Sequence, residues 1–284
     1  MYARILAVLW ESRSSNPIGK GRRLVGTGPP VEACSRRAGS SPVVVLITGA
    51  APYLGGPHTW KPLRDAAPEI TFVEIDALVV AGDRNMELHV REAVEAALRD
   101  ADGIVAHGGV CRVVLEAVAR VRSDMPVLLL SPMMVQRRTT FVRVARVVFG
   151  SPIVQSMLTR FARSKLRKLR ANRGYVRRQL GFFVRRDLIS DALVDEALAR
   201  LRDPRSTAIV DRTAEFLMSA LVQLDPAVDS AVRNRRTLVG GDMSDRRMAS
   251  RTGATVLPNA NGSPMIEEPQ TVAAVMRELL SARQ

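Results

Sequence analysis

The stretch VAHGGVCR, residues 105–112, joins a predicted buried strand to a predicted helix through a sharp turn. An apolar run at residues 103–106 precedes the turn, and a run with helical apolar spacing at residues 110–121 follows it. Many enzymes use such a strand–turn–helix junction to hold a nucleophilic side chain at the end of a sheet. At its apex, however, this chain has Gly108 and Gly109, which carry no nucleophile. The stretch therefore predicts an α/β fold and leaves open what the turn does.

Strands and helices are predicted to alternate on both sides of this turn. Strands, most of them continuous apolar runs typical of burial on both faces, are predicted at residues 42–47, 70–75, 103–106, 126–130, 236–240 and 254–257. Helices are predicted from near residue 59 and at residues 86–98, 110–121, 211–224, 246–250 and 264–280. This alternation with short connections favours a parallel sheet with right-handed crossovers.

One basic segment interrupts the alternation. Residues 133–205 have a helical pattern and contain 18 lysines and arginines against 5 acidic residues, in a chain of net charge +14. Nearly all of the excess charge therefore belongs to this segment. The predicted organisation is a flexible basic N-terminal segment (1–40, with one short strand at 31–37), the first part of an α/β core (41–132), a basic helical cap (133–205) and the second part of the core (206–284).

The composition narrows the functional class. Because 46% of the residues are hydrophobic, the chain is expected to fold as a globular protein. Its apolar runs are shorter than the ~20 residues of a membrane span, and residues 5–10 are too short for a secretory signal, so we expect a cytoplasmic protein. Two cysteines and three histidines form no recognisable zinc or disulfide pattern. We therefore expect no metal and no cofactor.

Three stretches together resemble the α/β-hydrolase superfamily, over most of the chain after residue 31. Residues 43–49 (VVVLITG) with 57–63 (PHTWKPL) resemble the strand, oxyanion loop and following helix of that family. Residues 104–110 (IVAHGGV) stand where the nucleophile elbow belongs, and residues 259–269 (NANGSPMIEEP) resemble the late histidine turn. The resemblance implies an α/β-hydrolase-type, mostly parallel sheet flanked by helices, with the basic segment as its cap.

The side chains of the family's catalytic triad are missing from this alignment. The chemistry needs a nucleophile at the elbow apex, a late histidine and a carboxylate that orients the histidine. Here the apex is Gly108 and the late histidine position is Gly262, while Asp242 and Asp245 compete for the acid position. The last of the three histidines is His107. Since removal of a triad nucleophile or base costs about 10⁶ in turnover, we do not expect classical esterase activity.

The backbone part of such a site does not depend on these side chains. The resemblance implies that the backbone N–H groups of Gly49, Ala50 and Gly109 form an oxyanion hole. Thr48, His107 and one of the two aspartates would line the cleft, and the glycine apex would let a ligand approach a helix N-terminus. Packing and general-base roles are both open for His107.

We interpret the chain as a non-hydrolytic member of this superfamily, resembling members that lack the serine and histidine and act as epimerases. Such a protein would bind a small or peptidic acidic ligand, stabilise an oxyanion and use substrate assistance in a proton transfer. One alternative is a ligand-binding pseudoenzyme. Another is a hydrolase with a non-standard nucleophile such as Cys111, close to His107, although a cysteine on a core helix more often packs as a small apolar side chain.

The basic cap suggests possible partners. Residues 160–170 place Phe161, Leu166 and Leu169 roughly on one helical face, with lysine and arginine on the others. Further arginines follow at Arg173, Arg177, Arg178, Arg185 and Arg186. The simplest interpretation is a lid helix whose cationic face is solvated. Two functional alternatives are that the cations bind an acidic ligand beneath the cap or contact a membrane surface. No nucleic-acid-binding motif is legible, so we expect no nucleic-acid partner.

Overall fold

The structure of the protein is a computed structural model. It describes residues 41–48, 54–75, 86–132, 151–204, 206, 232, 234–241 and 253–282. Several predicted features lie outside these residues: the strand at 31–37, the helices at 211–224 and 246–250, and the candidate residues Gly49, Ala50, Asp242 and Asp245.

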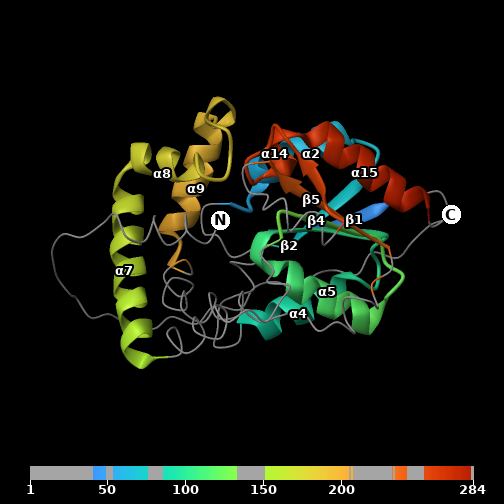
Figure 1. Cartoon of the computed structure of the whole chain (residues 1–284), viewed down its shortest axis with the longest axis horizontal. Coiled ribbons are helices and arrows are strands. Elements are labelled where there is room, and N and C mark those ends of the chain that lie inside the picture. Colours follow the sequence, from blue (N-terminus) through green and yellow to red (C-terminus); the bar gives the residue numbers. More distant parts are fainter. Residues whose placement is uncertain are drawn as a thin grey trace.

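The described strands form one six-stranded sheet in which every neighbouring pair is parallel, in the order β2-β1-β3-β4-β5-β6 (Figure 1). They are β1 (Val43–Thr48), β2 (Thr71–Ile75), β3 (Gly103–His107), β4 (Val127–Leu130), β5 (Arg235–Gly240) and β6 (Thr255–Leu257). Parallel strands joined by crossovers end at the same edge, so the residues that follow β1, β3 and β4 meet there. The predicted parallel α/β sheet is confirmed.

Helices cover both faces of the sheet. On one face are α4 (Met86–Ala97) and α5 (Cys111–Val121), the latter preceded by the short 3₁₀ helix η1 (Gly108–Val110); on the other are α2 (Pro57–Ala66), α14 (Pro264–Glu267) and α15 (Pro269–Ser281) (Figure 1). Successive side chains of a strand point to opposite faces. In β1, Val44 and Leu46 pack with the second group of helices and Val45 and Ile47 with the first. Burial on both faces explains why the central strands β1, β3 and β4 are almost unbroken apolar runs.

The described part of residues 133–205, the segment predicted to be a cap and called the cap below, is helical. It comprises α7 (Pro152–Ala171), α8 (Arg173–Leu180), the 3₁₀ turn η2 (Arg186–Leu188) and α9 (Asp191–Arg202). Helix α9 contacts α2 of the core, and α7 lies on the far side of α8 and α9 from the sheet (Figure 1). Asn172 separates α7 from α8, and its side chain accepts a hydrogen bond from the Tyr175 N–H (3.0 Å) at the start of α8.

The end of the chain differs from its prediction. The single helix predicted at 264–280 is two helices, α14 and α15, separated at Glu268. Proline disfavours helical geometry in the residue before it, and Pro269 follows Glu268, whose φ is −136° and ψ is 54°. Among the described helices, none is long and apolar enough to cross a membrane.

Candidate functional site

The chain turns sharply where β3 ends. His107 is still extended, with φ −118° and ψ 131°, whereas Gly108 has a φ of +72°, in the left-handed region that favours glycine. A Cβ placed on Gly108 would meet no described atom within 4 Å. The turn predicted from residues 105–112 therefore exists, and its apex faces open space into which a larger side chain or a ligand could extend.

The late turn lies against this elbow. The His107 Nε2 atom donates a hydrogen bond to the Gly262 carbonyl oxygen (2.8 Å), although the two residues are 155 positions apart. Thr48 is the register partner of His107 on the neighbouring strand. The structure thus brings together Thr48, His107, Gly108 and Gly262, four of the residues that the sequence assigned to one cleft.

The hydrogen bond to Gly262 determines the form of His107. A carbonyl oxygen only accepts, so Nε2 must carry the proton, and in the neutral ring Nδ1 then has a free lone pair. Burial lowers the pKa of His107 below its ordinary 6.5, and this effect outweighs the opposite influence of the Gly262 hydrogen bond. At neutral pH His107 is therefore an uncharged imidazole with an available basic nitrogen.

Four buried polar atoms belong to His107, to its register partner Thr48, and to Ser131 and Ser263. These atoms, here called the strand-end polar group, have no hydrogen-bond partner in the described part of the chain: Thr48 Oγ1, His107 Nδ1, Ser131 Oγ and Ser263 Oγ. Ser131 follows Leu130, the register partner of His107, and Ser263 follows Gly262. Buried polar groups in proteins are nearly always paired, so such a concentration at the ends of strands is typical of a ligand site.

Ser131 carries a second sign of a functional position. Its φ is +43°, the only positive value of a non-glycine residue in the described ranges. Left-handed geometry in a non-glycine residue costs about 1–3 kcal/mol, and such residues cluster at active and ligand-binding sites. The parallel register sets Ser131 beside the elbow apex, because Leu130 is opposite His107.

The cap helix α9 reaches the same end of the sheet. The Nη2 atom of Arg200 and Oγ1 of Thr48 both lie 3.2 Å from the point that a Cβ on Gly55 would occupy. One turn earlier, the Glu196 carboxylate accepts hydrogen bonds from the His58 N–H (2.5 Å) and the Thr59 hydroxyl (3.0 Å) at the N-terminus of α2. An anion at a helix N-terminus is stabilising. Helix α9 is therefore fastened to the core, and it brings a guanidinium close to Thr48.

Glu267 holds the late turn in place. Its Oε2 atom accepts from three consecutive backbone N–H groups, those of Asn261 (2.9 Å), Gly262 (3.2 Å) and Ser263 (3.0 Å). Its Oε1 atom accepts from the N–H of Arg185 in the cap (2.7 Å). One buried carboxylate thus orients the Gly262 carbonyl that His107 contacts and ties this turn to the cap.

Cys111 is not in a position to attack a substrate. Its side chain is fully buried, and Sγ donates to the Ala106 carbonyl oxygen (3.4 Å). Burial raises the pKa of the thiol, so the reactive thiolate is disfavoured. This geometry agrees with a packing role. In the described residues, no group of three or more histidine, cysteine, aspartate or glutamate side chains could hold a metal ion.

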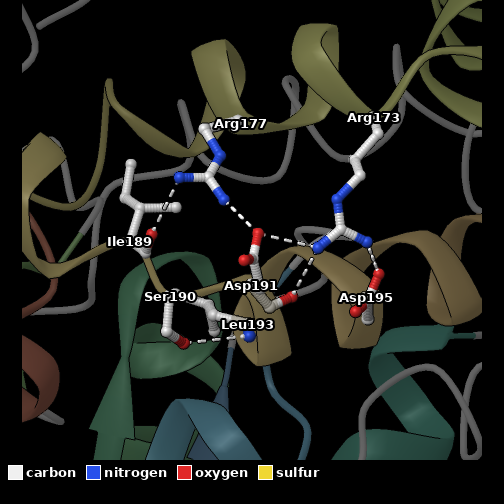
Figure 2. Close-up of polar contacts among 7 residues, drawn as sticks. All are labelled: Arg173, Arg177, Ile189, Ser190, Asp191, Leu193 and Asp195. Atoms are coloured by element: carbon white, nitrogen blue, oxygen red, sulfur yellow. Dashed lines mark hydrogen bonds and ion pairs between the residues drawn. The ribbon is translucent and has the colours of Figure 1, made fainter.

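Several arginines of the cap bind within the cap itself. Figure 2 shows Arg173 and Arg177 of α8 pointing at the first two turns of α9, where Arg173 contacts both Asp191 (2.8 Å) and Asp195, and Arg177 contacts Asp191. The Arg173 hydrogen bond, with the charge of Arg177, lowers the pKa of Asp191. Arg185 forms an ion pair with Asp187 (2.6 Å). These side chains fasten α8 to α9 and shape η2.

Sequence reasoning identified part of this site. The structure brings Thr48, His107, Gly108 and Gly262 together, and Gly109 lies in η1 directly after the apex. It also adds residues that the sequence analysis assigned no role: Ser131, Ser263, Arg200 and Glu267. Three of these residues had a signal in the sequence. Ser131 is the hydroxyl residue directly after the apolar run at 127–130, and Ser263 and Glu267 lie inside the motif at 259–269.

Solved structures with a similar fold are numerous. A serine hydrolase involved in carbazole degradation (CarC enzyme) matches 87% of this chain and 93% of its own, with a TM-score of 0.59 and 15% identity. Haloalkane dehalogenase DbeA from Bradyrhizobium elkani USDA94 matches 87% of this chain and 93% of its own, with a TM-score of 0.55 and 13% identity. The epoxide hydrolase CorEH matches 87% of this chain and 94% of its own, with a TM-score of 0.51 and 16% identity.

No model of a known protein family matches the chain, and no curated protein matches it significantly. The likeness to the solved structures lies in the fold, because the identities are only 13–16%. The chain has the α/β-hydrolase fold, and the fold inferred from the three resembling stretches is confirmed. The fold does not determine the activity of this chain, because proteins with the same fold catalyse many different reactions.

The state of His107 gives a testable pH dependence of stability. Since its pKa in the folded protein is below 6.5, the unfolded chain takes up this proton first as the pH falls. The contribution of neutral His107 is complete above pH 6.5 and is lost below it, by up to about 1.4 kcal/mol per pH unit until the folded-state pKa is reached. His107→Gln, whose amide can still donate to Gly262, removes the titration. Between pH 7.5 and pH 5.5, the free energy of unfolding measured with urea should therefore decrease more in the wild type than in His107→Gln. Equal decreases in the two proteins would contradict a buried neutral imidazole.

Proposed function

We propose that this protein is a non-hydrolytic α/β-hydrolase-fold enzyme that uses neutral His107 as a base in a proton transfer, of the epimerase or isomerase type. The observation that carries the proposal is the state of His107. Nε2 donates to the Gly262 carbonyl, and Nδ1 is buried with no partner in the described chain. A general base must be unprotonated and within reach of the proton that it removes, and His107 at the end of β3 meets the first requirement at neutral pH, because burial lowers its pKa.

The absence of a standard nucleophile supports proton transfer over hydrolysis. Gly108 at the elbow apex has no side chain, and no histidine follows His107 in the chain. The backbone groups that would stabilise an oxyanion need no side chain: η1 and α5 begin at the apex, so the Gly109 N–H is a candidate donor to a carbonyl, carboxylate or enolate oxygen. Such donors stabilise the enolate-like state formed when a base removes a proton next to a carbonyl.

The proposed ligand is a small or peptidic acid. Arg200 supports this choice, because its Nη2 atom and the Thr48 hydroxyl at the end of β1 each lie 3.2 Å from the same point, the position of a Cβ on Gly55. Guanidinium groups bind carboxylates through paired hydrogen bonds. The hydroxyl groups of the strand-end polar group can each donate to or accept from the rest of the ligand. In this arrangement the ligand occupies the carboxyl edge of the sheet beneath the cap, where α/β folds of this type bind ligands.

A solvent-exchange experiment tests the proposal. A panel of N-acetylated aspartate and glutamate and their dipeptides is incubated with the protein in D₂O, and deuterium at the α-carbon is measured by mass spectrometry and NMR. The wild type should catalyse exchange without hydrolysis. His107→Gln should lose at least about 100-fold of the rate, the usual contribution of a general base. His89→Gln, which changes an exposed histidine paired with Glu92, is the matched control and should keep the wild-type rate.

The other outcomes discriminate between functions. Saturable binding of these acids with no exchange would contradict the enzyme assignment and favour a ligand-binding pseudoenzyme. Exchange that survives in His107→Gln would remove His107 from the mechanism. Wild-type hydrolysis of an activated ester that is lost in His107→Gln would mean that the protein is a hydrolase with a non-standard nucleophile.

A further inference from the structure

The outer face of α7 exposes two large apolar side chains. Ile153 is 73% exposed and Met157, one helical turn later, is 64% exposed, while no other large apolar side chain in the described residues exceeds 42%. The opposite face of the same helix buries Leu166 and Leu169. Helix α7 therefore already has a buried side that packs within the cap, and these two side chains are not needed for that packing.

The same outer face continues as a row of cations. Arg160, Arg167 and Lys168 are exposed and make no ion pair in the described chain, and α7 contains no acidic residue at all. Two of the three arginines of the next helix differ from these, because Arg173 and Arg177 form ion pairs with acidic residues of α9 (Figure 2). The unbalanced charge of the described cap is thus concentrated on α7.

The apolar and basic residues share one side of the helix. At 100° per residue, the five members of this α7 outer face lie within an arc of about 100°: Ile153, Met157, Arg160, Arg167 and Lys168. Along the axis they cover roughly 22 Å at 1.5 Å per residue. Figure 1 shows α7 beyond α8 and α9, on the side of the described cap that faces away from the sheet.

We propose that the α7 outer face docks on the surface of a bilayer that contains anionic lipid. The helix lies parallel to the surface, with Ile153 and Met157 inserted at the boundary between head groups and acyl chains and with the three cations at the lipid phosphates. The two exposed apolar side chains decide the partner. A nucleic acid would engage the cations but leave Ile153 and Met157 in water, whereas a bilayer takes up both kinds of side chain.

Vesicle sedimentation tests this docking with the full chain. The probes are vesicles of 70% phosphatidylcholine with 30% phosphatidylserine, and vesicles of phosphatidylcholine alone. The wild type should bind the first and only weakly the second. Arg160→Gln with Arg167→Gln should reduce the partition coefficient about 25-fold, because each cation near an anionic surface contributes roughly 5-fold. The matched control, Arg99→Gln with Arg120→Gln, removes two exposed cations elsewhere and should leave binding within about 2-fold of the wild type.

A second pair of variants separates a bilayer from other polyanions. Ile153→Ser with Met157→Ser keeps the charge and should lower vesicle binding at least about 10-fold, while leaving retention on single-stranded RNA unchanged. Thermal unfolding within about 2 °C of the wild type confirms that these exposed changes leave the fold intact. The proposal is overturned if the wild type ignores anionic vesicles, if both charge variants lose binding equally, or if the serine variant binds vesicles as the wild type does.

Discussion

Gly108→Ser combined with Gly262→His is expected to create hydrolysis of p-nitrophenyl esters that neither single change produces. The two positions meet in the structure, because Gly262 accepts a hydrogen bond from His107, the residue before the apex. A serine and an imidazole there would restore the pair that removes and returns a proton during acyl transfer. A complete pair accounts for about 10⁶ in turnover, so even a poorly aligned one should exceed the wild-type rate by about 100-fold.

The structure also predicts the cost of this change. A side chain on Gly108 meets no described atom within 4 Å, so the serine should cause no clash. Its backbone, however, would have to keep a φ near +72°, which costs a non-glycine residue about 1–3 kcal/mol. The melting temperature should fall by roughly 2–4 °C for each kcal/mol in a chain of this size.

The control for this experiment is Gly108→Ala with Gly262→His, which has the same backbone strain and no nucleophile. Release of p-nitrophenol should stay at the wild-type level in this control. If the folded Ser/His variant gained nothing, Gly262 would not occupy the late histidine position. If Gly108→Ser alone gained the full rate, His107 would act as the base for the new serine, and a histidine at position 262 would not be needed.

The positions of most strands and helices were predictable from the local pattern of apolar residues, and the burial of the sheet explains why. Residues such as Val44 and Val45 point to opposite faces, and both faces are buried there, so the central strands β1, β3 and β4 are almost entirely apolar. The elbow was equally local, since Gly108 stands where a positive φ is needed. The division of the last helix at Glu268 also has a local signal in the sequence, because Pro269 follows Glu268. The helical spacing of apolar residues on both sides of the proline nevertheless predicts a single helix.

The composition of the site was less predictable, because it depends on contacts between distant segments. Ser131 is beside the apex only through the register of β3 with β4. The proton position on His107 depends on a carbonyl 155 residues later, and the approach of Arg200 to Thr48 depends on how α9 packs on α2. Likewise, the sequence shows a basic cap but not which arginines are paired; that distinction required the α8–α9 contacts of Figure 2.

Glu267→Gln is expected to destabilise the protein by about 3 kcal/mol, because the buried Glu267 carboxylate accepts hydrogen bonds from four backbone N–H groups. Glutamine has nearly the same shape but only one acceptor oxygen. Its NH₂ group must face either the N–H of Arg185 or the three N–H groups of the late turn, so at least one buried donor loses its partner and every remaining bond loses its ionic character.

The matched control is Glu268→Gln, which removes the same charge one residue later, at a half-buried side chain that accepts a hydrogen bond from the Thr271 hydroxyl (3.0 Å). It should cost less than about 1 kcal/mol. Thermal unfolding should therefore show a decrease of about 6–12 °C for Glu267→Gln and at most a few degrees for the control. Because Glu267 connects the turn of Gly262 to the cap at Arg185, equal decreases in both variants would mean that these contacts do not hold the two segments together.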